Sequence, residues 1–171
     1  MPVSFDDIKD VRIKINDPAG VIHIEEVSDS THLPSAPKKQ YIYYTISDEK
    51  YLSTEVESGA VPGDYKQVDL LVADDAIAAL ITASGVDTAV YRTIRLIMSK
   101  LGQQIRLASI SSGRESQTYT SLKELYDYYK DLAEVYKLQG AENVKQSTGL
   151  YGRVKRGHFD RHHDDIGGGN L

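Results

Sequence analysis

The stretch from Val72 to Gly140 constrains the fold most strongly, because it carries the clearest helix signals in the chain. Near its end, Ser121 and Glu124 match the Ser-x-x-Glu capping box, which satisfies free backbone N–H groups at a helix start. Gly140 can adopt the positive φ of a helix end. Between these signals one helical face carries apolar residues at steps of three and four, namely Leu122, Leu125, Tyr129, Leu132 and Tyr136. The sequence predicts a helix over residues 121–139.

A short helix is predicted at the start of the same stretch. Residues 73–81 have helical character, and Asp74 or Asp75 would cap the first N–H groups. Ser84 and Gly85 follow as a natural end.

A longer helix and a β-hairpin are predicted between these two elements. The helix begins at Asp87 as its N-cap and stops at Gly102. Its apolar stripe consists of Val90, Ile94, Ile97, Met98 and Leu101. Residues 105–110 then alternate in part, 111–113 resemble a turn, and 116–120 favour a strand, so we predict a small hairpin.

Residues 1–70 are predicted to be rich in β-strands. Val11, Ile13 and Ile15 alternate with polar residues, which predicts a strand paired in a hairpin with 21–27 across the turn at 16–20. The later segments favour a third and a fourth strand, and then either a fifth strand or an extended lead-in to the first helix. These segments are 41–46, 51–54 and 65–72.

The fold class expected from these elements is α+β, with three regions. They are a β-rich N-terminal region over 1–70, a helical core over 71–140 and an extended C-terminal tail over 141–171. The tail has few large apolar residues and several glycines, so we expect it to be flexible until a partner orders it. The strands could form one sheet within the chain or pair between neighbouring subunits.

Composition excludes several classes of function. The chain has no cysteine, which excludes disulfides, thiolate metal sites and a thiol nucleophile. It has no phosphate-binding glycine loop and no nucleophile elbow. The net charge of −5 gives no global reason to bind nucleic acid. We also expect no signal peptide and no membrane span. The sequence thus predicts a protein that is not an enzyme and has no cofactor.

The order of these elements resembles the head–tail adaptor, or connector, proteins of tailed bacteriophages. The resemblance lies in Leu71–Ile81, in Ala89–Met98, in the hairpin at 109–120 and in the helix at 121–139, which together cover about 70 of the 171 residues. It implies a virion protein that is assembled in the host cytoplasm and forms a ring, usually of twelve subunits, beneath the capsid portal. The ring would link the portal to a neck or tail-completion protein.

The resemblance also implies that the C-terminal tail reaches the portal. Between Gly149 and His163 the tail has four basic residues and one acidic residue, a net charge of +3. An acidic protein surface or DNA in the channel is then a candidate partner, and the alternative is a solvated, flexible end without a partner. The candidate docking residues are Tyr151, Arg153, Lys155, Arg156, His158, Phe159 and Arg161. On the last helix, Tyr128 lies about 100° from Tyr129, so it is either an exposed surface residue or a subunit contact.

Two alternatives to the adaptor remain open. Histidine and carboxylate side chains over residues 158–165 could bind a divalent metal, as in a small metal-dependent enzyme. A glycine-flanked tail, however, offers no rigid second shell, and the spacing matches no metal motif. The other alternative is a non-viral scaffolding module with the same topology.

Overall fold

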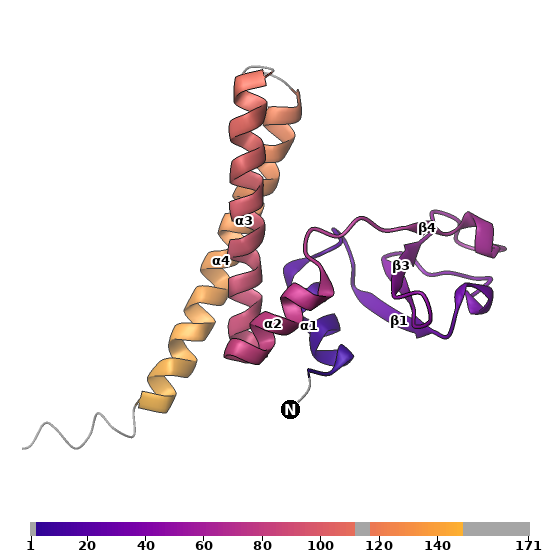
Figure 1. The fold of residues 1–171 in the computed structure, drawn as a ribbon, viewed down its shortest axis with the longest axis horizontal. Coiled ribbons are helices and arrows are strands. Elements are labelled where there is room, and N and C mark those ends of the chain that lie inside the picture. The colour runs from indigo at the N-terminus through magenta and orange to yellow at the C-terminus, as the bar shows by residue number, and fades with distance from the viewer. Residues whose placement is uncertain (1–2, 112–116, 149–171) are drawn as a thin grey trace, which may run out of the picture.

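The computed structural model describes residues 3–111 and 117–148 of the 171-residue chain (Figure 1). Over these ranges it contains four α-helices and one four-stranded mixed sheet, which confirms the α+β class. The helices are α1 (Phe5–Ile15), α2 (Asp74–Ser84), α3 (Val86–Ser111) and α4 (Gln117–Thr148). The strands are β1 (His23–Val27), β2 (Tyr41–Thr45), β3 (Lys50–Ser53) and β4 (Lys66–Gln67), and short 3-10 helices lie at Ser30–His32 and Pro62–Asp64.

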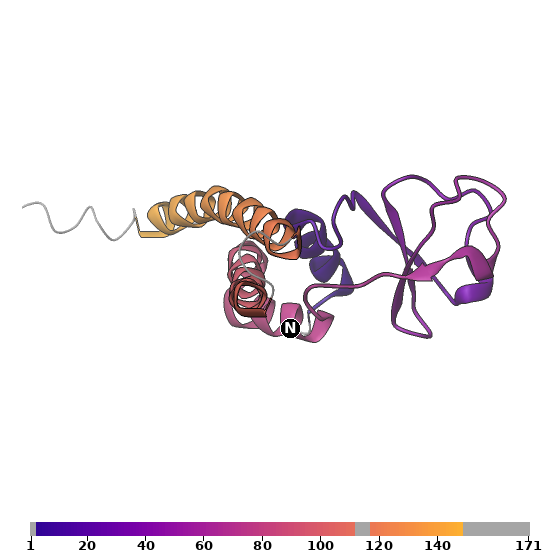
Figure 2. The same cartoon turned by 90° about the horizontal axis from the view of Figure 1, so that it is seen from above.

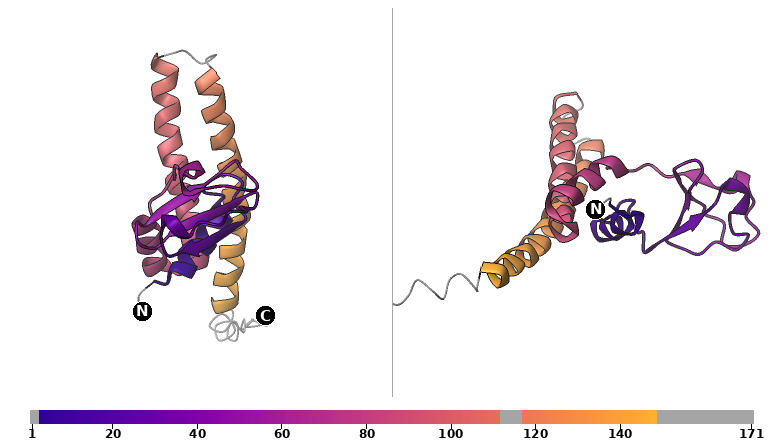
Figure 3. Two further views of the ribbon diagram at one scale, coloured as in Figure 1. Left: turned by 90° about the vertical axis from the view of Figure 1, so that its right-hand side faces the viewer. Right: turned by 60° about the horizontal axis from the view of Figure 1, so that its bottom comes forward.

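The long helices α3 and α4 lie side by side as a hairpin, and the sheet stands off to one side of it (Figures 1 and 3). Helices α1 and α2 lie between the two parts, which is clearest from above in Figure 2. The protein is therefore a helical hairpin joined to a small sheet through two short helices.

The strand predicted at residues 11–15 is wrong, because these residues belong to α1. Ser4 and Asp7 form a capping box at the start of this helix: the Ser4 hydroxyl accepts from the Asp7 backbone N–H at 3.2 Å. Val11 and Ile15 are four residues apart, and such a pair shares one face both in a helix and in a strand. Their spacing therefore does not distinguish the two structures. Asn16, in the left-handed conformation with φ 55°, ends the helix.

The sheet has the strand order β1-β2-β3-β4. β1 pairs in parallel with β2, from His23 opposite Tyr41 to Val27 opposite Thr45, whereas the other two pairings are antiparallel. The predicted hairpin between 11–15 and 21–27 is therefore absent. The strands predicted at 41–46 and 51–54 are confirmed as β2 and β3, and the four strands pair within one chain.

The β-hairpin predicted between the long helices is also wrong, because 105–110 lie in α3 and 117–120 lie in α4. Ile105 and Ala108 continue the helical spacing of Leu101, and Ala108 is buried, so packing favours helix beyond Gly102.

The ends of the predicted helices also differ from those in the structure. α4 begins at Gln117, so Ser121 and Glu124 lie inside it, and it runs past Gly140 to Thr148. Residues 141–148, predicted as part of the tail, are therefore helical. The N-cap of α2 is Ala73 rather than an aspartate, and Asp87 lies in the first turn of α3.

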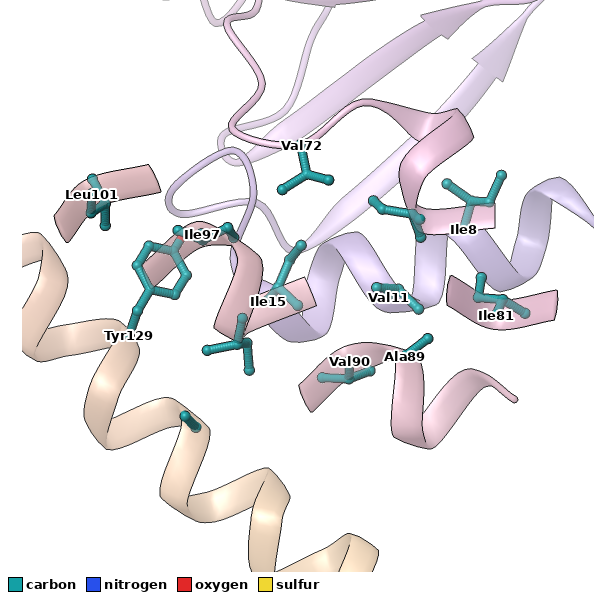
Figure 4. Packing of buried hydrophobic residues seen from close by; sticks show 13 residues of the cluster. Ile8, Val11, Ile15, Val72, Ile81, Ala89, Val90, Ile97, Leu101 and Tyr129 are labelled. Atoms are coloured by element: carbon teal, nitrogen blue, oxygen red, sulfur yellow. The ribbon is translucent and has the colours of Figure 1, made fainter. Parts of the chain in front are cut away.

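One hydrophobic core joins all four helices (Figure 4). α1 contributes Ile8, Val11 and Ile15 to it, and Tyr129 of α4 closes one side. The first helix thus belongs to the helical body, although the sequence grouped it with the strands. Phe5 connects this body to the sheet, where its ring stacks on Tyr44 with 4.2 Å between centroids.

Gly102 provides a direct test of the continuous α3. A Cβ added there would meet only the ring of Tyr126, at 4.0 Å, an ordinary van der Waals contact. Because alanine loses less backbone entropy in a helix, we expect Gly102→Ala to stabilise the protein by about 0.5–1 kcal/mol. Urea unfolding would measure the gain, and a loss of stability would contradict a helix running through this position.

Candidate functional site

The densest polar cluster in the described structure surrounds Arg12, whose side chain is fully buried. Its Nη1 donates to Asp17 Oδ2 at 3.1 Å, and its Nη2 donates to Asp74 Oδ1 at 2.5 Å. The same Nη2 donates to the carbonyl oxygen of Val72 at 2.8 Å. Tyr51 covers the guanidinium, with 4.9 Å from its ring centroid to Cζ, and its hydroxyl donates to Asp74 Oδ2 at 2.9 Å.

This cluster joins four parts of the chain. Arg12 lies on α1, Asp17 in the turn after it, Tyr51 on β3 and Asp74 at the first position of α2. Asp17 also accepts from the backbone N–H groups of Leu71 and Val72, at 3.0 and 3.1 Å. The cluster therefore fixes the segment that leads from the sheet into α2 against the end of α1.

The electrostatics of the cluster favour a fixed ion pair over proton transfer. Burial lowers the pKa of Arg12, but the charge of Asp74 and the hydrogen bonds outweigh it and leave the pKa raised. Burial disfavours the charged form of Tyr51 and so raises its pKa, which keeps the hydroxyl protonated as a donor. We conclude that the cluster stabilises the fold as a buried ion pair in which Arg12 keeps its charge and Tyr51 keeps its proton.

An open pocket of about 460 Å³ lies beside the cluster, between α1, the sheet and the start of α2. Phe5, Tyr44 and Gln67 line it, together with the accessible side of Asp74. Both carboxylate oxygens of Asp74 already accept hydrogen bonds from Tyr51, and one also contacts Arg12. Among the side chains that the structure describes, no group of three or more His, Asp or Glu could hold a metal ion.

The predicted site residues fall into two groups. Tyr128 lies on α4 with 43% of its surface exposed, and its ring packs edge-on against Tyr129 with 5.2 Å between centroids. This position suits both an exposed surface residue and a subunit contact. The seven candidate docking residues of the tail lie outside the described residues, as does the metal candidate at 158–165.

Sequence reasoning missed an apolar surface at the far end of α3. Leu107 is 66% exposed and Ile110 is 74% exposed, near the end of the helical hairpin. The helical spacing through Gly102 could have identified them, because it places Ala108 on the packed face and leaves these two residues off it.

Among the helices of the described residues, none combines the length and the apolar composition that a membrane span requires.

Comparisons with protein-family models, curated proteins and solved structures gave no match for this chain.

Alkaline pH offers a test of the packing of α4 on the body. Burial raises the pKa of Tyr129, and its hydroxyl donates to the carbonyl of Asn16 at 3.4 Å. Below pH 10 the phenol is neutral in both states. Above that, the unfolded chain ionises first and folding stability falls as pH rises. We expect Tyr129→Phe to reduce this loss, as measured by urea unfolding between pH 9 and 11, with the exposed Tyr128→Phe as control. An unchanged slope in Tyr129→Phe would contradict the burial of this hydroxyl.

Proposed function

We propose that this protein is a virion structural protein, a ring-forming head–tail adaptor that docks beneath the capsid portal at the neck of a tailed phage. The observation that carries the proposal is the α3–α4 hairpin, which projects from the body and exposes Leu107 and Ile110 near its end. Exposed aliphatic side chains on a rigid projection favour a role in contact with another protein.

The element order gives partial support. A short helix followed by two long helices corresponds to the resemblance, whereas the β-hairpin expected between the long helices is replaced by helix. The most polar buried cluster has a structural explanation in the packing of α1 and α2. Support for assembly thus comes from shape and exposed surface, and the metal-dependent alternative gains none from the described residues.

Electron microscopy of the protein mixed with portal tests the proposal. We expect rings seated on the portal, and a chain that remains monomeric beside portal in all conditions would refute it. Binding to a cellular protein but not to portal would instead favour a non-viral scaffolding module.

Deletion of residues 149–171 tests the proposed docking tail. The described core clusters lie within residues 8–133, so we expect the truncated chain to keep its unfolding midpoint and its helix content. Portal docking, measured by co-sedimentation, should be lost. Undiminished docking of the truncated chain would contradict the role of the tail while leaving ring formation to be judged by microscopy.

A further inference from the structure

An apolar groove of about 550 Å³ lies on the surface between α2 and α3. Small and aliphatic side chains form most of its lining, with two arginines beside them: Ala76, Ala79, Leu80, Leu96, Arg92 and Arg95. Such a groove fits a side-chain ridge of another helix, because small residues allow close approach of the backbone.

The two arginines are available for pairing. Both are exposed, and among the described residues no carboxylate oxygen lies within 4.0 Å of either guanidinium. Within the described part of the chain, Arg95 donates to the hydroxyl of Tyr91, at 3.3 Å, and to no other side chain. An occupant that combines apolar side chains with carboxylates would therefore match this groove.

The outer face of α4 has this combination. Glu124, Tyr128, Asp131 and Val135 follow one another at steps of four, three and four, so they form one stripe, and Asp127 lies beside it. Tyr128 is 43% exposed and Val135 is 51% exposed. Within the described ranges these three acids have no Lys, Arg or His partner within 4.0 Å.

This stripe faces away from the side of α4 that packs on α3, where Tyr129 and Ala133 are buried. Among the described side chains of α4, three lysines lie on the other flank of its outer surface, namely Lys123, Lys130 and Lys137. The acidic charge is therefore concentrated beside Tyr128 and Val135.

We propose that the α4 stripe of one copy docks into the α2–α3 groove of a second copy, with Asp127 and Asp131 facing Arg92 and Arg95. The inference rests on the proposed function and names the surfaces that meet in the ring. Groove and stripe are different surfaces of the same chain, so each copy offers both. Such a head-to-tail contact propagates and forms a ring when its rotation closes.

Charge reversal tests the pairing. The groove variant is Arg92→Glu with Arg95→Glu, and the stripe variant is Asp127→Lys with Asp131→Lys. Each alone places like charges across the contact, so self-association should weaken at least about tenfold. An equimolar mixture should assemble again, because each altered surface then meets an oppositely charged one. Sedimentation velocity and light scattering measure both results.

The control changes the same number of charges on the other flank of α4. Lys123→Glu with Lys130→Glu should leave self-association unchanged. Thermal unfolding of every variant, followed by circular dichroism, verifies that the exposed substitutions leave the fold intact.

Cross-linking provides a second measurement that also captures weak association. The chain has no cysteine, so Ala79→Cys in the groove and Tyr128→Cys on the stripe are unique thiols. A chain with both should give a ladder of covalent multimers with a short bismaleimide, whereas each single variant should stay monomeric. Lys130→Cys in place of Tyr128→Cys should give no ladder.

The outcomes separate this inference from the function on which it rests. Rings that form equally in both charge-reversal variants overturn the proposed contact and leave the adaptor function standing. Loss of assembly without rescue on mixing, or cross-linking of the Ala79→Cys variant to itself, also overturns it. So does a groove variant that self-associates normally but fails to bind a different virion protein. A wild-type chain that does not assemble on portal, together with an Ala79→Cys, Tyr128→Cys chain that gives no ladder, overturns both.

Discussion

Replacement of Arg12 by methionine is expected to lower the free energy of unfolding by about 3–5 kcal/mol. The substitution removes the cation but leaves the fully buried carboxylate of Asp17 and the half-buried carboxylate of Asp74 in place. It also leaves the carbonyl of Val72 without its donor. Equilibrium urea unfolding at pH 7, followed by circular dichroism, measures the change.

Arg106→Met is the matched control, because Arg106 is exposed on α3, lies outside the proposed groove, and lacks a carboxylate partner among the described residues. We expect it to change stability by no more than about 0.5 kcal/mol. The stability loss of Arg12→Lys should lie between those of the two methionine variants. The lysine ammonium keeps the charge but lacks the planar guanidinium that reaches Asp17 and Asp74 together. A loss below about 1 kcal/mol in Arg12→Met would show that the cluster is not a fixed ion-pair network.

The Arg12 cluster also determines where the sheet stands relative to the helical hairpin. Tyr51 belongs to the sheet, whereas Asp74 starts the helix that packs on α3. Because both contact the same guanidinium, loosening the cluster should let the sheet move against the body. In a ring, the sheet position would then vary between subunits.

Elements with strong local signals could be predicted from the sequence. β2 has the β-branched and aromatic residues of a buried strand, β3 carries the buried aromatic Tyr51, and α2 follows the predicted range closely. The parallel pairing of β1 with β2 could not be predicted, because it joins His23 to Tyr41 across a loop that carries no pairing signal. The sequence instead favoured a hairpin with the nearest alternating segment.

Elements whose local and tertiary signals conflict were predicted wrongly. Gly102 is an ordinary helix breaker, yet α3 passes through it and continues to Ser111. Burial of Ala108, in a helix that packs along α4, favours helix there. Gly140 was likewise read as a helix end, although α4 passes through it.

The Arg12 cluster shows why buried polar sites are hard to predict from sequence. In the predicted strand, Arg12 lay on the polar face and would have been solvated. Its partner Asp74 is 62 residues away and was assigned a capping role. The Ser4–Asp7 capping box was the local signal that could have corrected the helix, and with it the orientation of Arg12.

Substitution of Ile15 by alanine is expected to lower the free energy of unfolding by about 2–5 kcal/mol. Ile15 is fully buried among residues of α3 and α4 in the main core (Figure 4), where truncation leaves a cavity that the surrounding helices cannot fill. Urea unfolding measures the loss. If the slope of the free energy of unfolding against urea concentration is the same as in the wild type, the substitution has changed stability alone.

Ile13→Ala is the matched control, and it distinguishes the helix from the alternating strand. In a strand, Ile13 and Ile15 share one face, so both truncations would cost the same. In α1 they lie about 200° apart, and Ile13 is only partly buried and outside the core cluster. We therefore expect Ile13→Ala to cost less than about 1 kcal/mol. Equal losses at the two positions would contradict the helix and the placement of residues 5–15 in the helical body.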